Sequence, residues 1–151
     1  PCIAVDPWFI AATAPDRTPL IQTARRVNDG RPAAIADQTA ALPSVRGGAA
    51  IACLGLSYKA DIDDLRESPS MHVVEEIRKR TGNPVLVVEP HVDVLPGPLA
   101  ALANISLCNL DEALAKAGAV VLLTDHKEFL EITGDQLAGM DVIDTRGAWK
   151  R

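Results

Sequence analysis

The residues best suited to bind a ligand follow an apolar run at residues 49–54. That run leads into Gly55-Leu56-Ser57-Tyr58-Lys59, and the chain then passes Asp61, Asp63, Asp64 and Arg66 before Ser68 and Pro69. A lysine and an arginine in such a loop can contact phosphate oxygens, and the free N–H groups of a helix N-terminus add further donors. The loop therefore predicts an anion-binding site between a strand and a helix.

A plainer interpretation fits the same residues. Arg66 would pair with Asp63 or Glu67 at the surface, and Lys59 would only be solvated, as most exposed charges are. The glycines do not favour a dinucleotide site either, because the paired glycines precede the strand and no G-x-G-x-x-G sequence follows one. Spacing alone leaves anion binding and surface pairing both open.

Short apolar runs alternate with helical patterns through most of the chain. Runs bounded by Gly, Pro or Asp predict buried strands at residues 49–54, 85–88, 119–124 and 142–144, with a weaker strand at 105–108. Helices are predicted at residues 69–80, at residues 110–117 and in a shorter stretch after Asp125. This alternation predicts an open, parallel, Rossmann-like α/β sheet with helices on both faces and with ligands at the carboxyl ends of the strands.

A longer helical pattern precedes these strands. Apolar residues recur at helical spacing from Thr18 to Leu42, with Thr18 as N-cap, and this predicts one long connecting helix with Asn28 to Pro32 as the place for a kink. The Pro, Ser and paired Gly that follow predict a domain boundary, with residues 1–43 as a connecting segment and residues 44–151 as the α/β domain.

Composition excludes several classes of protein. With 151 residues and 48% hydrophobic content, the chain can fill one core of ordinary size. A net charge of −5 disfavours nucleic acid as a partner, since phosphate-backbone binders usually carry a basic face. The sequence has no apolar stretch of about 20 residues and no signal-peptide pattern, so we expect a cytoplasmic protein without a membrane segment.

The cysteines and histidines predict no metal centre. Cys2, Cys53 and Cys108 are an odd and widely spaced set, which suggests neither a disulfide framework nor a zinc site, and the latter two lie in or beside apolar strands where a thiol usually packs as a small hydrophobe. The three histidines share no ligand spacing. No metal is therefore predicted.

Three segments resemble one enzyme family. Residues 55–69, GLSYKADIDDLRESP, resemble the signature of the C-terminal domain of the UDP-glucose and GDP-mannose dehydrogenase family. Residues 2–9, CIAVDPWF, resemble the catalytic-cysteine segment of the branch that oxidises UDP-N-acetylhexosamines, UDP-N-acetylmannosamine above all, and residues 25–29, RRVND, continue that likeness. Residues 144–147, DTRG, resemble the family's terminal substrate-binding loop, so the resemblance covers essentially the whole chain.

This resemblance implies roles for four cationic or aromatic side chains in the α/β domain. Tyr58 and Lys59 would bind the UDP-sugar, and Arg146 would contact substrate across a dimer interface. Arg66 would reach the NAD that another domain binds. The family's arrangement further implies a homodimer formed through the helix at residues 18–42.

The resemblance also implies that Cys2 is a nucleophile. After a first hydride transfer to NAD gives an aldehyde, the thiolate would add to form a thiohemiacetal, whose oxidation gives a thioester that water cleaves. Asp6 would orient that water. Without the flanking match, a lone cysteine near a chain end would ordinarily be a free thiol.

The family pattern includes an NAD-binding domain and a catalytic lysine ahead of Cys2, and this chain carries neither. We therefore expect a fragment that is inactive alone, from an enzyme that oxidises the C6 alcohol of UDP-N-acetylmannosamine to the carboxylate, with two NAD, for surface polysaccharide synthesis. The alternative is a non-catalytic nucleotide-binding or dimerisation module. A G-x-G-x-x-G unit upstream of Cys2 in the gene would favour the enzyme.

Overall fold

Five strands form one parallel sheet in the computed structural model, which describes residues 5–149. The strands are β1 (Ala50–Leu54), β2 (Val85–Val88), β3 (Ile105–Leu107), β4 (Ala117–Leu122) and β5 (Asp141–Asp144). Their order across the sheet is β3-β2-β1-β4-β5, and every neighbouring pair is parallel. The predicted strands are confirmed, including the weaker one, and the open parallel sheet is the predicted fold class.

Both faces of the sheet are buried, and alternate residues of each strand face opposite sides. In β1, Ile51 and Cys53 belong to one hydrophobic cluster, while Ala52 and Leu54 belong to the other. The first cluster takes side chains from the helices that span Arg31–Ala41, Pro69–Thr81 and Gly97–Ala100, and the second takes them from the helices that span Leu110–Lys116 and Lys127–Leu130. Burial on both faces explains why the strands read as continuous apolar runs rather than as alternating patterns.

Four helices follow β1 among residues 5–149, and the two longest of them begin at residue types that helix N-caps prefer. They are α5 (Pro69–Thr81), α6 (Gly97–Ala100), α7 (Leu110–Lys116) and α8 (Lys127–Leu130). The Ser68 hydroxyl accepts a hydrogen bond from the N–H of Ser70, and Gly82 ends α5 in the left-handed conformation. The Asn109 side chain likewise caps α7 by accepting from the N–H of Glu112 at 2.9 Å.

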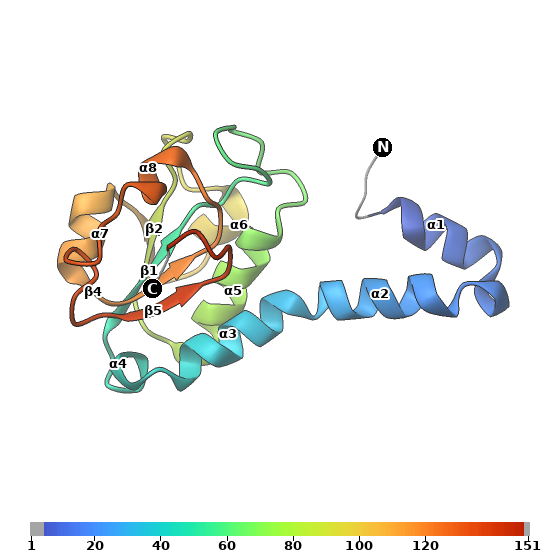
Figure 1. Cartoon of the computed structure of the whole chain (residues 1–151), viewed down its shortest axis with the longest axis horizontal. Helices are drawn as coiled ribbons and strands as arrows, with labels where there is room; N and C mark the ends of the chain where they lie inside the picture. Colours follow the sequence, from blue (N-terminus) through green and yellow to red (C-terminus); the bar gives the residue numbers. More distant parts are fainter. Residues whose placement is uncertain (1–4, 150–151) are drawn as a thin grey trace.

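An arm of helices precedes the sheet. It contains α1 (Asp6–Thr13), a 3-10 turn η1 (Pro15–Arg17), α2 (Pro19–Asp29), α3 (Arg31–Ala41) and the short α4 (Pro43–Arg46). The predicted single helix is therefore two helices, separated at Gly30. Pro32 has no N–H to donate to the preceding turn, and glycine is a poor helix former, which accounts for the interruption. Gly30 keeps a helical backbone, so α2 and α3 follow each other in nearly one direction (Figure 1).

The two halves of this arm have different surroundings. Helix α3 packs on α5 and contributes Ile35 and Ala36 to the core of the sheet domain. Helix α2 extends away from the domain and has no buried residue (Figure 1). The domain boundary at residues 43 and 44 stays a prediction. None of the helices within residues 5–149 combines the length and apolar character that a bilayer span requires.

Candidate functional site

The chain leaves β1 through a glycine that no other residue could replace without strain. Gly55 has a φ of +90°, a conformation that L side chains rarely adopt. A Cβ at this position would lie 2.5 Å from the Cβ of Thr124, which follows β4. The loop after β1 therefore passes directly against the end of β4, at the point where the strand order reverses and where ligands gather in open α/β sheets.

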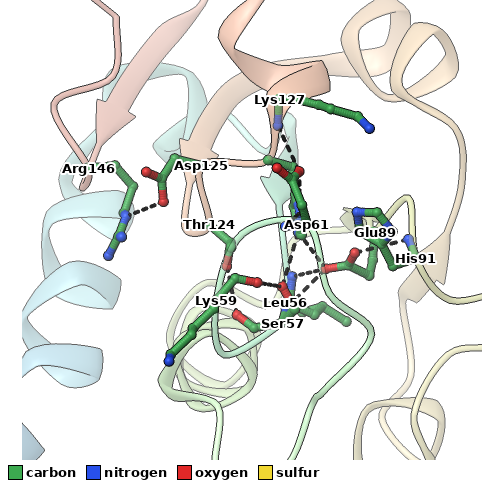
Figure 2. Close-up of polar contacts among 11 residues, drawn as sticks. Leu56, Ser57, Lys59, Asp61, Glu89, His91, Thr124, Asp125, Lys127 and Arg146 are labelled. Carbon is green, nitrogen blue, oxygen red and sulfur yellow. Dashed lines mark hydrogen bonds and ion pairs between the residues drawn. The ribbon is translucent and has the colours of Figure 1, made fainter.

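A buried carboxylate at the end of β2 holds the start of this loop. Figure 2 shows the Glu89 side chain pointing toward the loop backbone. Its Oε2 accepts hydrogen bonds from the N–H groups of Leu56 at 2.6 Å and Ser57 at 3.0 Å, and its Oε1 accepts from the N–H of His91 at 3.1 Å. Both oxygens are thus used within the fold.

The imidazole of His126 holds the loop further along. Its Nδ1 accepts a hydrogen bond from the N–H of Asp61 at 2.9 Å, so this nitrogen carries no proton. In the neutral ring the proton then lies on Nε2, which is 3.1 Å from Oε2 of Glu89 and 3.2 Å from Oγ of Ser57. Since the Ser57 hydroxyl donates its own hydrogen to the carbonyl of Lys59 at 2.6 Å, its oxygen is free to accept from Nε2.

Thr124, at the end of β4, joins the loop to helix α5. Its hydroxyl donates to the carbonyl of Ser57 at 2.9 Å and lies 3.3 Å from the hydroxyl of Ser70. Because the single hydroxyl hydrogen of Thr124 is used on Ser57, Ser70 must be the donor in the second contact. The Asp61 side chain also accepts from the N–H of Lys127 at 3.1 Å. Side chains and backbone from the ends of β2 and β4 therefore fix the loop at several points (Figure 2).

The charge of Glu89 is stabilised inside the protein. Burial raises the pKa of this carboxyl group, but hydrogen bonds from His126 and from the backbone N–H groups of Leu56 and His91 outweigh burial, and the pKa lies below its ordinary value. Glu89 is therefore a carboxylate at neutral pH, as its role as a multiple acceptor requires.

This lowered pKa predicts a loss of stability in acid. A carboxyl group whose pKa is lower in the folded than in the unfolded state stabilises the fold above the unfolded value, here 4.5, and loses that contribution as the pH falls through the folded value. Glu89→Gln should cost about 1.5–3 kcal/mol at pH 7, because it removes hydrogen bonds to a charged group. In urea denaturation, the difference in the free energy of unfolding between wild type and this variant should become smaller below about pH 4.5. A difference that does not change with pH would contradict this assignment.

Two of the predicted ligand-binding cations, Lys59 and Arg146, lie outside the buried cluster of Glu89 and His126 (Figure 2). Lys59 is exposed, and within residues 5–149 its ammonium group makes no hydrogen bond or ion pair; Figure 2 shows it extending away from the cluster. Arg146, on the loop after β5, donates from Nε to Asp125 at 2.8 Å and remains half exposed. Both residues thus lie at the carboxyl edge of the sheet, on the loops that leave β1 and β5 (Figure 2).

Arg66 pairs locally instead of joining that edge. Its side chain is 88% exposed, and its guanidinium donates to both carboxylate oxygens of Asp64 at 2.8 Å. The hydrogen bond from Arg66 lowers the pKa of Asp64 to about 2. The surface pairing considered from the sequence does occur, but with Asp64 rather than with Asp63 or Glu67. The exposed position leaves Arg66 accessible to another domain.

Tyr58 lines a pocket on the other side of the loop. The pocket has a volume of about 480 Å³ and lies between the junction of α2 with α3 and the start of α5. Arg25 and Arg31 line it together with Glu67, His72 and other residues, so charges of both signs surround the phenol. Tyr58 and Lys59 are neighbours in sequence, but the structure does not bring both side chains into this pocket.

Of the two predicted catalytic residues, only Asp6 lies among the described residues, and it lies apart from the sheet. Asp6 begins α1, which lies at the distal end of the arm (Figure 1). Cys2 lies outside the described residues. Of the other cysteines, Cys53 is fully buried, and burial raises the pKa of its thiol to about 12, so it serves as a small core residue. Cys108 is partly buried, and burial, followed by the charge of Glu112, also raises its pKa.

Asp61, His91 and His126 form a group that the sequence spacing did not reveal. One potential ligand atom from each lies within 4.8 Å of the others. Both nitrogens of His126 are already used in the hydrogen bonds described above, however, whereas Nε2 of His91 is buried and has no partner among the described residues. The group therefore has the residue types of a metal site, but hydrogen bonds already occupy both nitrogens of His126. The expectation of no metal stays a prediction.

The strand order and the polar carboxyl edge together define an α/β domain of the doubly wound class, in which ligands bind at this edge. Comparison with protein families identifies its type. Residues 52–151 match the UDP binding domain of the UDP-glucose/GDP-mannose dehydrogenase family, and the chain belongs to this family.

Individual relatives agree with this assignment. The NDP-N-acetyl-D-galactosaminuronic acid dehydrogenase of Ralstonia nicotianae is 49% identical, over 98% of this chain and 34% of that protein. The UDP-N-acetyl-D-mannosamine dehydrogenase of Escherichia coli is 46% identical, over 99% of this chain and 37% of that protein. The solved UDP-N-acetyl-mannosamine dehydrogenase from S. aureus superposes with a TM-score of 0.76 at 31% identity, over 100% of this chain and 35% of that one. The chain thus spans about a third of the length of these relatives.

Proposed function

We propose that this chain is the UDP-sugar-binding part of an NAD-dependent dehydrogenase that oxidises the C6 alcohol of a UDP-N-acetylhexosamine, UDP-N-acetylmannosamine above all, to the uronic acid used in surface polysaccharides. Family membership and the names of the relatives support this proposal. The observation that carries it is the loop after β1, which is fixed to the ends of β2 and β4 while the ammonium group of Lys59 remains free.

The same loop argues against NAD as the ligand of this domain. Dinucleotide-binding domains use a glycine-rich first turn and an acidic residue that binds the ribose. Here the chain has no such glycine pattern, and the carboxylate at the end of β2, Glu89, already accepts hydrogen bonds from the loop itself. The residues present do not fit NAD, so we assign its binding to another domain, with Arg66 exposed to reach it.

A diphosphate would contact cations at the carboxyl edge of the sheet. Lys59 is free to contribute its full charge, and Arg146 can exchange its ion pair with Asp125 for a phosphate oxygen, since such an exposed pair is worth little. In the whole enzyme we further propose that Cys2 is the nucleophile that adds to the aldehyde and that Asp6 orients water.

UDP binding is the direct test of this function. Isothermal calorimetry should detect UDP binding to the chain, and Lys59→Ala should weaken it about tenfold or more, because a hydrogen bond to a charged group contributes about 1.5–3 kcal/mol. Lys116→Ala is the matched control, since Lys116 is an exposed lysine that precedes β4 and so lies at the amino edge of the sheet. Equal affinities for wild type and Lys59→Ala would exclude this lysine from the site.

We also propose that the arm forms a homodimer. Leu20 and Val27, one face of α2, are 80% and 66% exposed, and Phe9 on α1 is exposed as well. An apolar stripe of this kind normally packs against a partner. Sedimentation should therefore show a dimer for wild type and a monomer for the double variant Leu20→Glu/Val27→Glu. Arg26→Glu, which lies roughly 110° around α2 from that stripe, should remain dimeric, and a monomeric wild type at high concentration would contradict the proposal.

A further inference from the structure

We propose that Glu89 and His126 are positioning residues for the UDP-binding loop: they hold the backbone of residues 56–61 so that Lys59 is presented to the diphosphate. This inference rests on the proposed function. Neither residue contacts a ligand in this scheme, because both side chains are completely buried.

The loop has little internal structure of its own to hold it. Residues 55–68 contain no helix or strand. Side chains from elsewhere in the chain hold residues 56–61 in place. Glu89 accepts from the backbone N–H groups of Leu56 and Ser57, and His126 accepts from the N–H of Asp61. Buried N–H groups without such partners would be costly, so these two side chains determine where the loop runs.

A continuous series of hydrogen bonds connects this pair to the lysine. The Glu89 carboxylate accepts a hydrogen bond from Nε2 of His126, and the same nitrogen lies 3.2 Å from Oγ of Ser57. The Ser57 hydroxyl in turn donates to the carbonyl of Lys59 at 2.6 Å. The peptide group of Lys59 is therefore fixed, whereas its side chain points outward (Figure 2). A fixed backbone limits the conformational entropy that ligand binding would otherwise have to offset.

Core packing alone does not explain a charged residue and an imidazole at these positions. Burying such a pair is expensive, and apolar residues of similar volume often stabilise a protein as well or better. Both faces of the sheet around them are filled by apolar side chains. The acceptor atoms of the pair are, however, directed at the loop backbone and at each other, which is the arrangement that loop positioning requires.

Substitutions of His126 can separate positioning from simple stability. Asn places its carbonyl oxygen near the position of Nδ1, so His126→Asn should still accept from the N–H of Asp61. His126→Gln should reach Glu89 but lose the Asp61 contact, and His126→Ala should lose both. We expect UDP affinity to fall about tenfold for Asn and for Gln, since each loses one of the two attachments, and to fall further for Ala, which loses both. Hydrogen exchange of the Asp61 backbone amide should be slow in wild type and in His126→Asn and faster in the other two variants.

Calorimetry and amide exchange should be measured at a temperature where circular dichroism shows every variant folded. Glu128→Gln is the control, since Glu128 lies on α8 and makes no hydrogen bond to the loop among the described residues; it should bind UDP like wild type. If wild type binds UDP and all three His126 variants bind equally well, the positioning role is wrong while the proposed function stands. If wild type does not bind UDP, the proposed function fails, and this inference fails with it.

Discussion

Gly55→Ala is expected to destabilise the protein by about 3 kcal/mol or more, through two effects that act together. The φ of +90° is strained for any residue with a Cβ, and that Cβ would also lie 2.5 Å from the Cβ of Thr124 and 2.9 Å from its backbone N and O. Because neither the end of β1 nor the end of β4 can move without disturbing the sheet, the clash cannot be relieved locally. Urea denaturation should show a large fall in the midpoint.

Two other glycines separate strain from steric clash. Gly48 has a φ of +88° with nothing within 4 Å of an added Cβ, so Gly48→Ala should cost only the conformational strain, about 1 kcal/mol. Gly134 has neither the positive φ nor a close neighbour, and Gly134→Ala should be nearly neutral. If Gly55→Ala were no worse than Gly48→Ala, the close approach of the loop to β4 would be incorrect.

Phe129→Ala should have a comparable effect, about 3–5 kcal/mol, which is typical of removing a large buried aromatic side chain. Phe129 is fully buried in the hydrophobic cluster beneath α7 and α8 and contacts the ring of His126 edge-on, with ring centroids 5.4 Å apart. Its loss would therefore leave a cavity and also free the imidazole that holds the loop. Thermal and urea unfolding should both report the loss.

The neighbouring residue offers a matched control for this substitution. Leu130 follows Phe129 in α8 but is 52% exposed, so Leu130→Ala should change the free energy of unfolding by about 0.5 kcal/mol or less. Similar losses for the two variants would mean that α8 does not pack on the sheet as described.

The strands could be predicted from the sequence because a buried parallel strand leaves a simple local signal. Runs such as residues 85–88 are apolar, short and bounded by turn residues, and the structure places β2 at those same residues. Helix α5 was equally clear, since Ser68 and Gly82 mark its two ends. The connecting helix was less clear: the predicted place for a kink, residues 28–32, contains the observed break at Gly30, but the apolar periodicity that continues across Gly30 predicted one helix rather than two.

The interior of the site could not be predicted in this way. Glu89 and His126 are 37 residues apart, and neither has a neighbour in sequence that indicates a shared role. A signal did exist, since each follows a predicted strand, and the carboxyl ends of all strands in a parallel sheet lie at one edge. The partners considered for Arg66, Asp63 and Glu67, were wrong, because spacing does not distinguish these acids from Asp64, which the turn geometry selects.

The central claim is that the carboxyl edge around β1, β4 and β5 binds the diphosphate of a UDP-sugar. A titration of the ¹⁵N-labelled chain with UDP, followed by amide chemical shifts, tests it most directly. The account predicts saturable shifts concentrated at residues 55–61 and 144–147. Saturable shifts confined to another surface, such as the groove near Leu137 and Trp149, or no shifts at millimolar UDP, would contradict it.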